Sequence, residues 1–194
     1  MILETIITTV DIVGKSHVTP FGVRCEDKII IISPYKPSTT LDNVLATKCA
    51  VMNLSDDVRI FAGALTGRQP WALVPASQVQ GYRLSNCLAH SELKLLEVRD
   101  DGLRPQLVMQ KVFSENHQAF SGFNRAQAAV IELAVLVSRL DRLPKEKVMT
   151  ELAYLQIAID KTAGENEREA WGWLLSKIQS FYSNTITKMT ENKA

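Results

Sequence analysis

The stretch that decides the predicted fold is LETIITTVDIVGKSHVTPFGVRCEDKIIIIS, residues 3–33. Thr, Val and Ile dominate it, and turn residues interrupt them at short intervals, a pattern typical of β-strands. We expect strands at residues 3–10, 16–24 and 28–33, of which the first two form a hairpin. The third strand holds four consecutive isoleucines, which indicates burial on both of its faces.

The pattern changes after this stretch. Pro34 and Pro37 interrupt the strand. Thr39, followed three residues later by Asp42, has the form of a capping box, so we expect a helix to begin here. A strand at residues 49–54 follows the helix.

Two more elements complete the first part of the chain. Capping side chains at residues 55–57 predict a short helix that Gly67 ends. Residues 92–98 and 106–112 flank the turn sequence Asp-Asp-Gly and form the clearest hairpin in the chain.

The C-terminal part has the apolar period of helices from about residue 124. Residues 126–140 are apolar nearly all round, which predicts a central helix or one at a subunit interface. Pro144 opens a second helix that runs to Gly164, and a third helix contains Trp171. The predicted organisation is an N-terminal domain at residues 1–118, a helical part at 119–187 and a frayed polar tail at 188–194.

Composition excludes several classes of function. The 194 residues are 46% hydrophobic, enough for a sizeable core, and the net charge is +1. Such a chain has no bulk attraction for nucleic acid or anionic lipid, so neither is an expected partner. No apolar run approaches the roughly 20 residues that a membrane span needs, and the first residues lack the layout of a signal peptide. We expect a cytoplasmic protein.

Cysteines and histidines give no sign of a metal site in the sequence. They are Cys25, Cys49 and Cys87, and His17, His90 and His117. The cysteines lack CxxC spacing, so we expect buried thiols rather than a zinc site or a disulfide. The histidines are scattered, without an HxxxH pair or a nearby carboxylate set, so no metal is predicted.

The order strand, turn, strand, strand, Ser/Thr-rich helix start and strand resembles the FMN-binding split β-barrel superfamily, especially its flavin-reductase-like members. The residues that carry this resemblance are 8–10, 19–23, 38–41 and 51–54. A closer resemblance, over nearly the whole chain, is to a family of unknown function found mainly in archaea and in bacteria with methanopterin-linked one-carbon metabolism. It rests on residues 4–6, 20–23, 40–45, 81–84 and 122–126.

The resemblance implies an α+β protein, in which a mostly β split-barrel domain binds FMN and a bundle of about three helices follows. A phosphate needs hydrogen-bond donors and positive potential. Ser38, Thr39 and Thr40 supply hydroxyls, the helix N-terminus supplies N–H groups, and Lys36 supplies charge. The alternative is that these hydroxyls only cap the helix.

The superfamily lays the flavin ring against a strand that corresponds to Thr19, Pro20, Phe21, Gly22 and Val23. Gly22 permits close approach of the backbone, and Pro20 has a carbonyl but no N–H. The alternative is an ordinary edge strand with a kink.

Other residues have weaker claims to the predicted flavin site. By analogy Asn53 contributes an amide, or else ends a strand. Arg125 and Arg83 reach an anion or form structural ion pairs. Trp71 covers a flavin ring or packs in the core.

The resemblance implies that bound FMN, rather than a catalytic side chain, supplies the chemistry, and no catalytic residue is predicted. The leading hypothesis is an FMN-dependent oxidoreductase that reduces flavin or a pterin-like substrate. The alternatives are a non-catalytic FMN carrier or sensor and a pyridoxamine-phosphate-oxidase-like enzyme. The second ranks lower because the barrel half has few basic residues. Split barrels of this superfamily are usually dimers, so a homodimer with the flavin at its interface is expected.

Overall fold

The computed structural model describes residues 1–68 and 70–191, of which 184–191 are described by their backbone alone. These residues divide into two compact units. The first unit consists of Met1–Asp56 and Pro70–Ser121. The second consists of the short segment that begins at Asp57 and of the chain from Gly122 onward.

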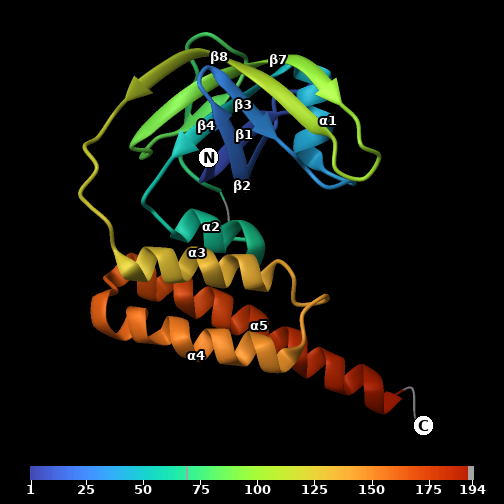
Figure 1. The fold of residues 1–194 in the computed structure, drawn as a ribbon, viewed down its shortest axis with the longest axis vertical. Helices are drawn as coiled ribbons and strands as arrows, with labels where there is room; N and C mark the ends of the chain where they lie inside the picture. The colour runs from blue at the N-terminus through green and yellow to red at the C-terminus, as the bar shows by residue number, and fades with distance from the viewer. Residues whose placement is uncertain (69, 192–194) are drawn as a thin grey trace. The chain divides into compact units, whose positions relative to one another are not determined.

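The first unit is built on a closed barrel with the strand order β1-β2-β3-β8-β7-β4 (Figure 1). Its strands are β1 (Ile2–Val10), β2 (Ser16–Glu26), β3 (Ile29–Ile32), β4 (Cys49–Leu54), β7 (Ala89–Arg99) and β8 (Gln106–Asn116). Neighbouring strands are antiparallel around the whole barrel. The predicted strands and the hairpin around Asp-Asp-Gly are confirmed, although both hairpin strands are longer than expected. The predicted α+β split-barrel fold class is confirmed as well.

Alternate residues along the strands fill the barrel, because successive side chains of a strand point to opposite faces. The buried cluster inside it consists of Ile7, Val23, Ile30, Ile32, Ala50, Met52, Leu93, Leu107 and Met109, with Leu41 and Val44 from helix α1 (Thr39–Thr47). Asn43 of α1 donates a hydrogen bond to Thr9 of β1 at 3.0 Å, and both side chains are buried. These contacts fix where α1 begins relative to β1.

The N-terminus of α1 differs from the prediction by one residue. Ser38, rather than Thr39, is the N-cap, because its backbone is extended and its Oγ accepts the N–H of Leu41 at 3.2 Å. Asp42 lies in the first turn of the helix but is not part of a capping box with Thr39.

A second, two-stranded sheet was absent from the prediction. It pairs β5 (Leu73–Pro75) with β6 (Tyr82–Leu84), and β6 contacts β1 and β4 of the barrel. Strands of three residues carry too little periodicity to be recognised in a sequence. Their position depends on a contact with the buried Asn53, which is described below.

The second unit is helical. It contains α2 (Arg59–Thr66), α3 (Arg125–Val137), α4 (Lys145–Thr162) and α5 (Glu165–Glu191). Helix α2 packs against α3 and α5, although it lies between β4 and β5 in the sequence. The predicted end of α2 at Gly67 is confirmed, since this residue takes the left-handed conformation with φ 74°. The three expected C-terminal helices are present.

Two details of the helical unit differ from the predictions. Helix α3 ends at Val137, three residues before the predicted end at residue 140. The tail predicted to fray from residue 188 is helical as far as Glu191, and the rest of it lies outside the described residues.

Among the described residues, no helix combines the length and the apolar character needed to cross a membrane.

Candidate functional site

The first turn of α1 carries the hydroxyls predicted to hold a phosphate. They differ in accessibility, because Ser38 is half-buried and engaged as the cap, Thr39 is exposed, and Thr40 is only 1% exposed. The first N–H groups of a helix lack partners within the helix and carry a positive partial charge. The cap already uses the N–H of Leu41, so the remaining anion-binding groups are the other first N–H groups of α1 and the exposed Thr39 hydroxyl.

Lys36 lies just before this turn, and its charge is already paired. Its Nζ lies 3.2 and 3.3 Å from the two carboxylate oxygens of Asp100, in the turn of the β7–β8 hairpin. The pKa of Asp100 is lowered by the N–H of Gly102 and by Lys36. A phosphate bound here would compete with Asp100 for the ammonium group.

The predicted ring-binding stretch lies in the middle of β2, with Thr19, Pro20, Phe21, Gly22 and Val23 paired to β1. The pairing of β2 with β3 covers only Arg24 to Glu26. The other edge of residues 19–23 is thus not paired with a strand in the described parts of the chain. Helix α1 contacts β2, so the two elements that carry the predicted phosphate and ring sites are neighbours.

Gly22 lines a shallow pocket on the outside of the barrel. A Cβ added at this position would lie 3.1 Å from Oε1 of Glu4, so a side chain here requires that carboxylate to move. Arg24 and Arg104 line the same pocket, and the Arg104 guanidinium donates to the carbonyl of Ser33 at 3.0 Å. Arg24 follows Gly22 by two residues on the same face of β2, whereas only the fold brings Arg104 to Gly22.

Asn53 is fully buried, and its amide is used within the chain. Its Nδ2 donates to the carbonyl of Ile6 at 3.1 Å and to Oγ1 of Thr8 at 2.9 Å, while its Oδ1 accepts the N–H of Leu84 at 2.8 Å. Asn53 therefore joins β4, β1 and β6. A role toward flavin stays a prediction for this residue.

The remaining predicted residues lie elsewhere. Arg125 is exposed at the start of α3 in the helical unit, next to Asn124, which caps that helix. Arg83 on β6 donates to the carbonyl of Leu84 at 3.0 Å. Trp71 is half-buried, and its indole N–H is buried without a hydrogen-bond partner in the described chain.

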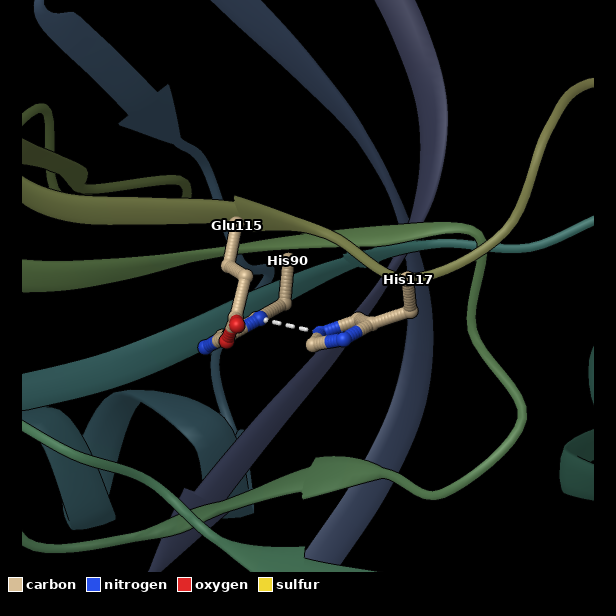
Figure 2. Close-up of side chains that lie close together, drawn as sticks. All are labelled: His90, Glu115 and His117. Atoms are coloured by element: carbon tan, nitrogen blue, oxygen red, sulfur yellow. Dashed lines mark hydrogen bonds between the residues drawn. The ribbon is translucent and has the colours of Figure 1, made fainter.

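A polar cluster on β7 and β8 brings together two of the three histidines that are scattered in the sequence. His90 and Glu115 are directly opposite each other in the hairpin, and His117 follows Glu115 by two residues, on the same face. Nδ1 of His90 lies 2.8 Å from Nε2 of His117, and the two rings are stacked (Figure 2). The third histidine, His17, lies on β2.

Glu92 follows His90 by two residues on β7 and contacts its ring. Its buried carboxylate accepts the backbone N–H groups of Ser77, Gln78 and Val79 and lies 3.3 Å from Nε2 of His90. Burial alone raises the pKa of Glu92, yet these hydrogen bonds together hold it below its usual range. Burial, followed by the charge of Arg83, lowers the pKa of His117.

Comparisons with known proteins agree with this architecture. Two models of one family, described as protein of unknown function (DUF447), match residues 3–118 and residues 124–176. The chain belongs to the DUF447 family. The predicted likeness to a family of unknown function is thereby confirmed. No curated protein sequence matches this DUF447 chain.

Solved structures with the same fold include another DUF447 protein. The FMN-bound protein of Methanosarcina mazei has a TM-score of 0.78 at 18% identity, over 91% of this chain and 94% of that one. A 2-nitrobenzoate 2-nitroreductase of Pseudomonas fluorescens has a TM-score of 0.51 at 18% identity, over 59% and 64% of the two chains. An NADH:FAD oxidoreductase of Streptomyces globisporus has a TM-score of 0.50 at 9% identity, over 59% of this chain and 70% of that one. These likenesses establish the fold of the DUF447 chain.

Proposed function

We propose that this DUF447 chain binds FMN and acts as a flavin-dependent oxidoreductase of the flavin-reductase type. The observation that carries the proposal is the edge of β2 at residues 19–23 that no described strand pairs with, on a strand that helix α1 contacts. Ser38 and Thr39 lie at the N-terminus of that helix. The FMN bound to the Methanosarcina mazei protein of the same family supports the choice of cofactor.

The residues at the start of α1 fit a phosphate. The helix N-terminus offers N–H groups, Thr39 offers an exposed hydroxyl, and Lys36 offers a cation that can turn from Asp100. Ser38 holds the turn in place through its bond to the N–H of Leu41. Thr40 is buried and is assigned no direct contact.

The residues of β2 fit the polar edge of a flavin ring. An unpaired strand edge presents N–H and C=O groups in alternation, and at Pro20 it offers the carbonyl alone. Gly22 gives little bulk beside this edge, and Arg24 and Arg104 place positive charge close to Gly22. Bound FMN supplies hydride chemistry at its N5 atom, so this chain needs only to bind the flavin, orient it and shield it from water.

The electron donor is inferred from two solved structures with the same fold. The named relatives with this fold include a nitroreductase and an NADH:FAD oxidoreductase, which favour a nicotinamide donor. The link to methanopterin-dependent metabolism rests only on where the resembling family occurs, and no described residue carries it. A non-catalytic FMN carrier remains the alternative from another class.

The homodimer is part of the same proposal. Ile2, Leu96 and Leu103 are large apolar side chains that are more than half exposed on the barrel unit, and a second copy would cover them. Sedimentation of the FMN-loaded chain is expected to give twice the monomer mass of 21.6 kDa. A monomer at all concentrations would contradict this part of the proposal.

The function is tested by absorption spectroscopy followed by reduction. The chain is mixed with FMN, freed of excess by gel filtration, and titrated anaerobically with NADH and NADPH. Retained flavin bands that bleach with a donor support the oxidoreductase. Retained bands that neither donor bleaches favour the carrier. Absence of bands would overturn the FMN proposal.

A further inference from the structure

We propose that His90, Glu115 and His117 form a binding site for a divalent transition-metal ion such as Zn²⁺, separate from the proposed FMN site. One nitrogen of each ring and a carboxylate oxygen of Glu115 lie within 4.8 Å of one another. Figure 2 shows the three side chains converging from β8, β7 and the segment after β8. The site belongs to the barrel unit alone.

The sequence creates this arrangement through a pair of mirrored motifs. His90-Ser91-Glu92 on β7 and Glu115-Asn116-His117 at the end of β8 are an HxE and an ExH. In an antiparallel pair, residues two apart share a face and opposite residues are neighbours on it. The pairing of His90 with Glu115 therefore places all four chemistry-bearing side chains on one face. Ser91 and Ser114 meet on the other face, with their hydroxyl oxygens 2.9 Å apart.

Glu92 orients His90 as a ligand. A carboxylate only accepts hydrogen bonds, so the contact of 3.3 Å assigns the ring hydrogen of His90 to Nε2. The lone pair of Nδ1 then points at His117. A carboxylate behind a ligating histidine is the usual support of a protein metal site. Three backbone N–H groups hold this carboxylate in place, so the orientation of His90 is fixed before any ion arrives.

The His117 side chain can turn away from His90 to admit an ion. The two facing nitrogens are 2.8 Å apart, whereas ligands of a tetrahedral zinc ion lie about 3.3 Å from each other. His117 follows the last residue of β8 and is only partly buried, so its side chain has room to turn. Its Nε2 becomes a ligand when the ring carries its hydrogen on Nδ1 instead.

The local charges favour a cation. Glu92 and Glu115 contribute two negative charges, and Arg83, which acts electrostatically on His117, contributes one positive charge. Two imidazoles with one carboxylate form the ligand set of catalytic zinc sites and of non-haem iron sites, with a position left for water or substrate. Glu115 is exposed, so this open position faces solvent.

The proposed metal lies far from the proposed phosphate. Asp100, the partner of Lys36, lies in the turn of the hairpin, whereas His90 and Glu115 lie near its other end. Nine residue-to-residue steps separate His90 from Arg99, which is about 30 Å measured along the strand. Zinc retention and FMN retention are measured separately on each variant.

The test uses the full chain without an affinity tag, stripped with a chelator and loaded with Zn²⁺. The wild type is expected to retain about one zinc per chain after gel filtration. His117→Ala and Glu115→Gln are expected to weaken Zn²⁺ binding at least 100-fold by calorimetric titration. His17→Gln removes a histidine outside the cluster and should leave zinc binding unchanged.

Two results would overturn the metal site. One is a wild-type chain that retains no zinc. The other is a His117→Ala or Glu115→Gln chain that retains as much as the wild type, which would show surface binding elsewhere. Circular dichroism and FMN retention monitor folding of the variants, and Glu115 is exposed, so its substitution removes a ligand without opening the core.

Discussion

Asn53 Oδ1 accepts the backbone N–H of Leu84 at 2.8 Å, and this bond ties the small β5–β6 sheet to the wall of the barrel. The same amide donates to Ile6 and Thr8 of β1. A single buried side chain therefore connects three strands that are remote in sequence.

Replacement of Asn53 by alanine should destabilise the protein by about 3 kcal/mol. The substitution leaves the buried N–H of Leu84 and the hydroxyl of Thr8 without these partners, and each unsatisfied group costs about 1–3 kcal/mol. Urea denaturation measures the change in the free energy of unfolding. Asn116→Ala, at an exposed position, is the control and should change it by less than about 0.5 kcal/mol. Equal stability of Asn53→Ala and wild type would show that the amide bonds do not hold the sheet.

Asp100→Asn should strengthen FMN binding a few-fold. The substitution keeps a side-chain oxygen for the N–H of Gly102 but removes the charge that holds Lys36. An exposed ion pair is worth less than about 1 kcal/mol, which sets the size of the effect. Lys36→Ala should act in the opposite direction, weakening FMN binding. Fluorescence titration measures both affinities, and unchanged values in both variants would remove Lys36 from the phosphate site.

Acid should destabilise the protein partly through His17. Burial lowers the pKa of His17 below 6.5 in the folded chain. The unfolded chain therefore takes up the proton first as the pH falls through 6.5. The free energy of unfolding falls with the pH until the folded pKa is passed. At higher pH both states are neutral, and His17 contributes no pH dependence.

His17→Gln should accordingly flatten the loss of stability below pH 6.5 and leave the slope above pH 7 unchanged. Urea midpoints measured across this range for both chains give the comparison. The lowered pKa of His117 contributes in the same direction in both chains, so it cancels in the difference. Parallel curves for the two chains would contradict a lowered pKa of the half-buried His17.

Much of the barrel could be predicted because its signals are local. β-branched residues and turn sequences marked β1 to β4, and Asp-Asp-Gly marked the β7–β8 hairpin. The β5–β6 sheet could not be predicted, because its strands are short and a side chain of β4 positions them. The sequence predicts α2 as a helix. Its packing against α3 and α5 depends on contacts between segments far apart in the sequence, which local patterns do not indicate.

The histidine cluster was missed for a different reason. The predicted hairpin stopped at residues 92 and 112, whereas the strands continue to Ala89 and Asn116. Both strands advance nine residues between the pair Arg99–Gln106 and the pair His90–Glu115, so the two register shifts between them cancel. Extension of the hairpin from its turn would have paired the HxE with the ExH. The signal was present in the sequence, but it depended on strand length, which side-chain patterns define poorly.

We expect the start of α1 to hold the phosphate of FMN. The most direct measurement is a comparison of FMN and riboflavin affinities by fluorescence titration, because the two ligands differ only in that phosphate. The helix N-terminus, Thr39 and Lys36 together predict that FMN binds about 100-fold more tightly than riboflavin. Equal affinities for the two ligands, or no binding of either, would contradict the claim.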